Sequence, residues 1–267
     1  MAVPPYNRLV PRVQLLATCL VDRLFPDVGL SAASVLERIG YDVHVPEGQT
    51  CCGQPALNAG FLPEARAMAR YTVDLLSRDA APIVIPSGSC ADMLIHHAPE
   101  LLHAEPEAAA RASQVAARTY EFTQFLVDVS GRADCGACLR STATYHPSCH
   151  GLRGLGLERQ PQALLDAVDG LELRPLGEAQ TCCGFGGLFA VKMDGISGAM
   201  LDRKLDAIDA TGADVVIGTD VSCLMHIGGG LHRRGSRVQA RHIAEVLASQ
   251  ALRGKDAGPD PQRSGRE

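Results

Sequence analysis

The sequence predicts an α/β fold in which two pseudo-symmetric repeats of parallel β–α–β units form Rossmann-like halves. Short apolar segments alternate with amphipathic segments along the 267 residues. The pattern of the first half also recurs in the second, about 130 residues later. We expect a first repeat at 12–128, a linker at 129–141, a second repeat at 142–250 and a disordered polar tail at 253–267.

The first repeat alternates predicted strands with predicted helices. Leu62, Ala65, Ala69 and Val73 recur at helical spacing and share one face of a helix. An alanine- and glutamate-rich segment favours another helix at 104–117. The other expected elements are strands at 12–18, 41–45 and 82–86, and helices at 30–39 and from residue 91 onward.

The second repeat has the same order of predicted elements. Leu201, Leu205 and Ile208 give one helix an apolar face. Each repeat closes with a short extended piece that runs into an apolar helix, at 120–126 and at 240–247. The other expected elements are strands at 142–146, 171–175 and 213–218, and helices at 160–168 and 197–210.

Eight of the ten cysteines form one four-thiol pattern that occurs twice. In each repeat a single cysteine precedes an adjacent Cys-Cys pair, separated from it by 31 residues in the first repeat and 32 in the second. Another cysteine follows each pair after 37 and 39 residues. The first set is Cys19, Cys51, Cys52 and Cys90, and the second set is Cys149, Cys182, Cys183 and Cys223.

These cysteines follow the carboxyl ends of predicted strands, where helices begin. Open parallel sheets bind ligands at that edge. Helix N-termini there carry unpaired N–H groups and a positive dipole end, which lower thiolate pKa values and favour an anionic group. The predicted fold and the cysteine positions therefore support each other.

Four thiols in each repeat match two kinds of inorganic centre. A [4Fe–4S] cluster takes four cysteine thiolates, and a structural zinc ion takes four nitrogen or sulfur ligands. We expect one or two [4Fe–4S] clusters, with zinc at one or both sites as the alternative. Gly53 and Gly184, directly after the pairs, allow the chain to turn with positive φ around such a group. Simple burial of cysteine would not require the repeated spacing.

Other candidate residues give weaker signals. His226 is a candidate additional ligand, as are His146 and His150 on either side of Cys149. No serine–histidine–aspartate arrangement or carboxylate pair predicts a catalytic residue. The glycines after Cys183 lack the order of a nucleotide-binding loop.

A separate Cys-x-x-Cys motif lies in the predicted linker. Cys135 and Cys138 could form a redox pair, a metal half-site or incidental loop thiols. These alternatives cannot be separated by spacing, because the motif stands outside the duplicated pattern.

Composition excludes several classes of protein. A net charge of −5 and a pI near 6.0 argue against nucleic-acid binding. No apolar run approaches the roughly 20 residues of a transmembrane helix. The first residues lack the features of a signal peptide, and a chain of this length needs no disulfide scaffold. We therefore expect a cytoplasmic protein with reduced thiols.

The combined motifs resemble the cysteine-rich CCG domain family. The segments that carry the resemblance are Thr50–Gly60 (TCCGQPALNAG), Tyr145–His150 (YHPSCH), Cys182–Gly187 (CCGFGG) and Cys223–Gly229 (CLMHIGG). Members include the cysteine-rich subunit of heterodisulfide reductase, the iron–sulfur subunits of glycolate oxidase and anaerobic glycerol-3-phosphate dehydrogenase, and a cysteine-rich subunit of some succinate dehydrogenases. The likeness covers about residues 12–250 and is greatest to the short, stand-alone lactate-utilisation members.

The resemblance implies an iron–sulfur oxidoreductase subunit that transfers electrons while a multi-component system oxidises L-lactate, a 2-hydroxy acid, to pyruvate. Its implied partners are a ferredoxin-like iron–sulfur protein and a small companion subunit. The alternatives are a zinc-binding structural or scaffold protein of the same fold and a heterodisulfide-reductase-like thiol redox subunit.

One departure from the family pattern bears on the cluster type. In the heterodisulfide reductase relatives each pattern ends in Cys-x-x-Cys and supplies five thiols to a noncubane cluster. Met93 and His226 stand at the last position here, which favours an ordinary four-thiol centre. The succinate dehydrogenase relatives imply that one of two such sites can hold zinc.

Overall fold

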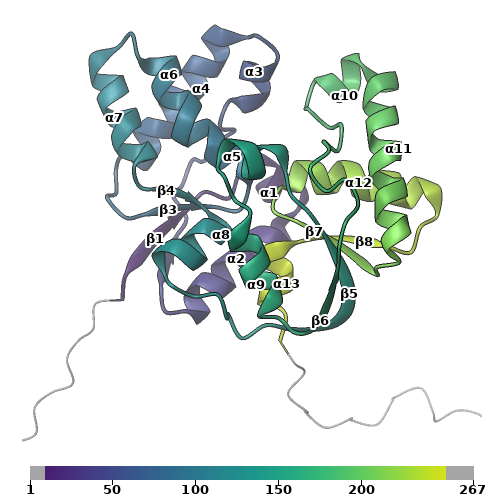
Figure 1. The fold of residues 1–267 in the computed structure, drawn as a ribbon. Helices are drawn as coiled ribbons and strands as arrows, with labels where there is room; N and C mark the ends of the chain where they lie inside the picture. The colour runs from purple at the N-terminus through teal and green to yellow at the C-terminus, as the bar shows by residue number, and fades with distance from the viewer. Residues whose placement is uncertain (1–9, 251–267) are drawn as a thin grey trace, which may run out of the picture.

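The computed structural model describes residues 10–250 and contains two four-stranded sheets of parallel strands (Figure 1). The first has the strand order β2-β1-β3-β4 and comprises β1 (Arg12–Leu15), β2 (Asp42–His44), β3 (Ile83–Ile85) and β4 (Thr119–Glu121). The second has the order β6-β5-β7-β8 and comprises β5 (Cys138–His146), β6 (Asp169–Arg174), β7 (Val215–Gly218) and β8 (Gln239–His242). Both halves thus use one topology, which confirms the predicted α/β class and its duplication.

Helices connect successive strands in both halves. Those of the first half are α1 (Cys19–Leu24), α2 (Pro26–Arg38), α3 (Gln54–Asn58), α4 (Leu62–Leu76), α5 (Gly88–Asp92), the π-helical turn η1 (Met93–His97), α6 (Ala98–Leu102), α7 (Pro106–Ala116), α8 (Phe122–Gln124) and the π-helical turn η2 (Phe125–Val129). Those of the second half are the π-helical turn η3 (His150–Gly154), α9 (Arg159–Asp166), α10 (Phe189–Lys192), α11 (Asp194–Thr211), α12 (Val221–Arg234) and α13 (Ile243–Ala248).

Local sequence explains where several helices begin and end. Proline occupies the first or second position of α2, α3, α4, α6 and α7, where its missing N–H would have no partner within the helix. Gly212 and Gly235 adopt left-handed backbone conformations directly after α11 and α12 and end these helices.

One hydrophobic core joins the two halves. Val13 and Leu15 of the first sheet and Val215 and Ile217 of the second belong to it. The core also includes buried residues of α2, η2, α9 and α13, and these elements lie between the two sheets (Figure 1). The halves are therefore packed as one body, with the strand ends of both sheets in fixed relation to each other.

The outer face of each sheet has its own core. Ile83 and Ile85 face a cluster formed with α4, α6 and α7, whereas Val84 between them faces the shared core. In the second half Val216 packs with buried residues of α11 and α12. Burial on both faces accounts for the continuous apolar runs in β3 and β7, as expected of parallel strands.

Some predicted boundaries differ from the structure. β1 ends at Leu15 rather than at residue 18. β5 begins at Cys138 rather than at residue 142, because Cys138 pairs with Asp169 of β6 across a register shift. The segment expected as a linker thus contributes its last residues to the sheet. The helix predicted from residue 91 begins at Gly88 and continues through η1 and α6.

Two expectations concern the ends of the chain and the membrane. The predicted tail at 253–267 lies outside the described residues. Within residues 10–250, every helix is too short or too polar to cross a membrane.

The acidic side chain of Glu121 is fully buried at the end of β4. Its Oε2 atom accepts hydrogen bonds from the backbone N–H groups of Thr123, at 2.7 Å, and Gln124, at 3.2 Å, and so caps α8. Burial raises the pKa of Glu121 to about 7, and these hydrogen bonds oppose the rise. The folded state therefore favours the protonated acid.

Replacing Glu121 with Gln is expected to stabilise the protein at pH 8 by about 3 kcal/mol. The carboxyl group ionises near pH 4.5 in the unfolded chain but near pH 7 in the folded protein. The folded protein therefore loses stability as pH rises between these two values. Glutamine cannot ionise, yet its amide oxygen can still cap α8. Urea denaturation at pH 5 and pH 8 should show a much larger gain at pH 8. Equal stability of both proteins at pH 8 would contradict the buried, protonated acid.

Candidate metal centres

All eight cysteines of the duplicated pattern lie beyond strand ends. Cys19 is the first residue of α1 after β1, and Cys90 lies in α5 after β3. In the second half Cys149 directly precedes η3, and Cys223 lies in the first turn of α12. The two Cys-Cys pairs lie in the loops that follow β2 and β6. The predicted placement at the carboxyl edge is confirmed.

The first centre brings four sulfur atoms together. Cys52 Sγ lies 3.4 Å from Cys90 Sγ, and the neighbouring thiols of Cys19 and Cys52 lower the pKa of Cys51. The hydrogen bond from Cys19 is the main cause that lowers the pKa of Cys51. Thr18, just before Cys19, has a φ of 46°, an uncommon conformation for a residue that bears a β-carbon. The four thiols thus form one connected set.

The second centre repeats this arrangement. Cys183 Sγ lies 3.2 Å from Cys223 Sγ, and hydrogen bonds from Cys149 and Cys183 lower the pKa of Cys182. The backbone N–H of Gly184 also donates to Cys182 Sγ over 3.3 Å. Hydrogen bonding within this set therefore favours the thiolate at Cys182.

Glycine follows each pair for a steric reason. Gly53 and Gly184 have φ values of 95° and 89°, as the sequence predicts. A β-carbon on Gly184 would lie 2.7 Å from the backbone oxygen of Ser197, and one on Gly53 would lie 3.1 Å from the β-carbon of Met68. The loops can therefore pack against α4 and α11 only with glycine at these positions.

A buried lysine distinguishes the second centre from the first. Lys204 of α11 is 1% exposed, and its Nζ donates to the backbone oxygens of Glu178 and Ala179 at 2.9 and 3.2 Å. Burial lowers the pKa of Lys204, and the nearby cysteines of the second centre oppose that shift. The lysine holds the loop that carries Cys182 and places a cation near its thiols.

The two centres face one cavity of about 650 Å³. All eight patterned cysteines line it, together with side chains such as Phe185, Val191 and Gln54. Gln54 of the first half reaches the ring of His150 in the second half, at 3.2 Å from Nε2. Because both sets of thiols border the same cavity, the halves together form a single site.

Asp220 connects the cysteine-bearing helices of the two halves. Its Oδ2 accepts from the backbone N–H of Ser89 at 2.8 Å and from the Ser87 hydroxyl at 3.2 Å. Its Oδ1 accepts from the N–H and the hydroxyl of Ser222, at 3.0 and 2.6 Å. One buried carboxylate therefore caps α12, which carries Cys223, and binds the start of α5, which carries Cys90.

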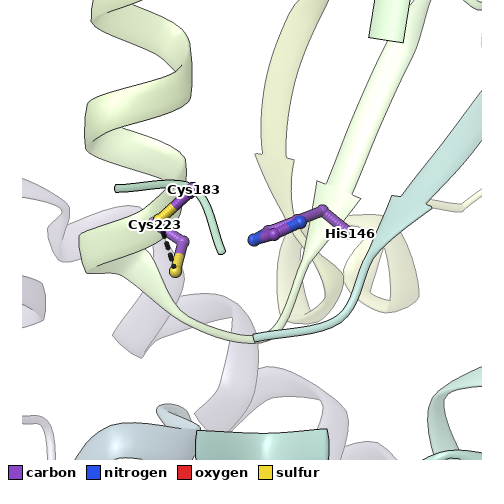
Figure 2. Close-up of side chains that lie close together, drawn as sticks. All are labelled: His146, Cys183 and Cys223. Carbon is purple, nitrogen blue, oxygen red and sulfur yellow. Dashed lines mark hydrogen bonds between the residues drawn. The ribbon is translucent and has the colours of Figure 1, made fainter. Parts of the chain in front are cut away.

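The histidines near the second centre differ in their contacts. His226 Nε2 lies 3.4 Å from the Ser197 hydroxyl, and its ring packs on Phe185. His146, at the end of β5, points toward Cys183 and Cys223 (Figure 2). One nitrogen of His146 and the Sγ atoms of Cys183 and Cys223 all lie within 4.8 Å of one another, a grouping suited to a metal ion. The sequence analysis named His226 as the leading candidate for an additional ligand and His146 as a further one. The grouping in the structure contains His146 and not His226.

The donor sets fit a metal or an iron–sulfur cluster. Within residues 10–250 every cysteine is a free thiol, and both sets combine partly buried sulfur atoms with an adjoining cavity. Four thiols and glycine-turned loops are the ligand environment of both a [4Fe–4S] cluster and a structural zinc ion. The chemistry of the donors thus fits the predicted cofactors without separating the two kinds of centre.

Cys135 and Cys138 lie apart from these sites. Cys135 is buried in the shared core, where burial raises its pKa to about 11. Cys138 is the first residue of β5, and neither thiol lines the common cavity. Since reactive cysteines need lowered pKa values, this pair is poorly suited to thiol chemistry at neutral pH.

The fold and site define a class of protein: a duplicated α/β chain with two four-thiol centres on a common cavity. The profile of the cysteine-rich domain family called CCG matches residues 13–95 and 143–228, and the chain belongs to that family.

Two named relatives are similar over nearly their whole length. Lactate utilization protein A of Bacillus cytotoxicus is 48% identical over 240 residues, which are 90% of this chain and 100% of that protein. The protein of the same name from Geobacillus kaustophilus is 49% identical over 236 residues, covering 88% of this chain and 98% of the relative. Among solved structures, glutamate racemase from Francisella tularensis matches 90% of this chain and 78% of its own, at 11% identity and a TM-score of 0.33.

Proposed function

We propose that this chain is an electron-transfer iron–sulfur subunit of a multi-component system that oxidises L-lactate to pyruvate. The observation that carries the proposal is the convergence of eight thiols, in two sets of four, on one cavity. The relatives named Lactate utilization protein A support the choice of substrate. A bound [4Fe–4S] cluster would supply one-electron redox chemistry.

The residues of this chain would hold, polarise and shield such a centre. Cys19, Cys51, Cys52 and Cys90 would hold it in the first half, and Cys149, Cys182, Cys183 and Cys223 in the second. Backbone N–H groups, such as that of Gly184 toward Cys182, stabilise thiolate charge. Cys52 and Cys183 are 4% and 2% exposed, which limits access of water to the sulfur atoms.

Removal of hydride from lactate is assigned to a partner. The sequence has no flavin or nicotinamide fingerprint, and the described residues that line the cavity include no arginine that could bind the carboxylate of lactate. We propose a ferredoxin-like iron–sulfur protein and a small companion subunit as partners, with the complex acting in the cytoplasm.

The second candidate function is that of a zinc-binding scaffold protein. The grouping of His146 with Cys183 and Cys223 favours it for the second half, because mixed histidine and cysteine sets are common zinc sites. The first half, with four thiols, suits either metal.

Anaerobic purification with analysis of iron, acid-labile sulfide and zinc tests the proposal. We expect a brown protein with iron and sulfide in similar amounts and an EPR signal after reduction. A deletion strain carrying Cys182→Ser should lose growth on L-lactate but keep growth on pyruvate. A colourless protein that contains only zinc would reject the iron–sulfur function, and normal growth of the variant would reject the role in lactate oxidation.

A further inference from the structure

The second centre has an imidazole where the first has an alkyl side chain. His146 is the third residue before Cys149, and Leu16 is the third residue before Cys19. Leu16 directly follows β1, and His146 is the last residue of β5; these are corresponding inner strands of the two sheets. Leu16 packs into the outer core of the first half. The equivalent position is thus buried in both halves. An apolar side chain such as Leu16 satisfies the fold there, so the fold alone does not explain a histidine.

His146 is buried without a hydrogen-bond partner. It is 1% exposed, and among residues 10–250 neither Nδ1 nor Nε2 makes a hydrogen bond. Buried polar atoms in folded proteins are nearly always paired, because an unpaired one loses its hydration without compensation. An imidazole with two unpaired nitrogens therefore points to a binding partner that the protein chain does not supply.

The geometry indicates what that partner is. A nitrogen of His146 and the two sulfur atoms lie within 4.8 Å of one another (Figure 2). A tetrahedral metal with nitrogen at about 2.0 Å and sulfur at about 2.3 Å places such ligand atoms about 3.6 Å apart. A neutral imidazole has a lone pair on one ring nitrogen, and this is the atom that metals bind in histidine.

The other two histidines near the second centre have protein partners. His226 lies beside the Ser197 hydroxyl, and His150 lies beside the side-chain amide of Gln54. Each of these two rings therefore has a protein partner for at least one of its nitrogens. His146 is thus set apart from both neighbours by its contacts as well as by its burial.

We propose that His146 donates a ring nitrogen to the metal of the second centre, together with Cys183 and Cys223, so that the two centres have different donor sets. The metal is one that accepts both imidazole and thiolate, either iron of a cluster or zinc. The inference rests on the metal-binding part of the proposed function and is independent of the role in lactate oxidation.

Pulsed EPR of the full-length, metal-loaded protein tests this assignment. Iron is examined after reduction, and any zinc found by metal analysis is examined after exchange for cobalt(II). We expect a strongly coupled nitrogen that changes its splitting when histidine is labelled with ¹⁵N. His146→Leu, which copies Leu16 of the first half, should abolish this coupling. His226→Met, which copies Met93 of the first half, is the matched control and should keep it.

A second variant separates ligation from folding. His146→Cys should retain the metal of the second centre, because it restores a soft donor, but should lose the nitrogen coupling. Metal-loaded protein without any coupled nitrogen would overturn the inference while leaving the proposed function intact. Coupling that survives His146→Leu but disappears in His226→Met would assign the ligand to His226 instead and would also overturn it. Absence of metal from both centres would reject the proposed function itself.

Discussion

Cys52→Ala is expected to empty the first metal centre and leave the second loaded, and Cys183→Ala is expected to do the opposite. Cys52 and Cys183 are the buried members of their Cys-Cys pairs and lie beside Cys90 and Cys223. The substitution to alanine removes one thiolate donor. Because the position is buried, water does not take the place of that donor. Each variant should therefore lose roughly half of the bound metal, because a centre that lacks one of its ligands binds metal less tightly.

The measurement is metal per protein, combined with the EPR signal that remains in each variant. Cys138→Ser is the matched control, because that thiol lies outside the common cavity, and its metal content should equal that of the parent protein. If each single variant lost the metal of both centres, the centres would not be independent. If neither lost metal, the eight-thiol assignment would be wrong.

Independence of the two centres follows from how the outer cores are built. Cys52 and Cys90 belong to a core formed with α4, α6 and α7, whereas Cys183 packs with α11 and α12. A cavity left by alanine in one of these cores does not touch the other. The shared core between the sheets contains none of the eight patterned thiols, so it should stay intact in both variants.

The eight thiols could be predicted from the sequence because duplication makes spacing informative. Strand ends of a parallel sheet meet at one edge, so a cysteine after β1 and another after β3 must lie near each other. The repeated Cys-Cys-Gly turn then identifies the remaining donors. Neither inference requires knowledge of side-chain packing.

The common cavity could not be predicted in the same way. It depends on how α2 and α13 pack between the sheets, burying residues such as Val35 and Val246. Periodicity identifies these residues as buried but does not say which helix meets which. The relative placement of the halves is a consequence of surface shape, and the spacing of cysteines carries no information about it.

The role of His146 could be predicted from the sequence only in part. Three histidines flank the second set of cysteines, and spacing alone does not choose among them. A signal was nevertheless present in the internal alignment, where His146 falls on Leu16, an apolar residue near a strand end. A histidine at a position that is apolar in the other repeat is a candidate for a buried, functional side chain.

The strand boundaries that differ have local causes. The start of β5 contains Arg140 and Ser141, which lack the apolar alternation typical of a strand. Pairing of Cys138 with Asp169 extends the strand nevertheless, because backbone hydrogen bonds do not depend on the side chain. Tertiary pairing therefore overrides the local pattern at this edge.

The two centres are joined through Asp220 rather than through their cysteines. Four donors at the starts of α5 and α12 converge on its carboxylate, and Asp220 is 2% exposed. Hydrogen bonds to a buried charged acceptor are stronger than those between neutral groups. Loss of that acceptor leaves backbone N–H groups of both halves without a partner in a place that water does not reach.

Asp220→Ala is therefore expected to lower the free energy of unfolding by about 3 kcal/mol, combining loss of the helix cap with unpaired buried donors. Metal content should fall in both centres, because Cys90 and Cys223 lie in the two helices that the carboxylate holds. Asp214→Ala is the matched control. Asp214 accepts from the N–H and hydroxyl of Thr142 at the exposed surface of the second half, so its loss should cost under about 1 kcal/mol and leave both centres loaded.

Chemical denaturation and metal analysis of both aspartate variants distinguish a connecting role from a merely local one. A local cap of α12 would, on removal, affect the second centre alone. Asp220→Asn sharpens the distinction, because one amide oxygen can still cap α12 while the amide nitrogen meets the Ser89 N–H donor to donor. We expect this variant to keep more metal in the second centre than in the first. Full metal content at the first centre in both Asp220 variants would show that the halves are held together by their shared core alone.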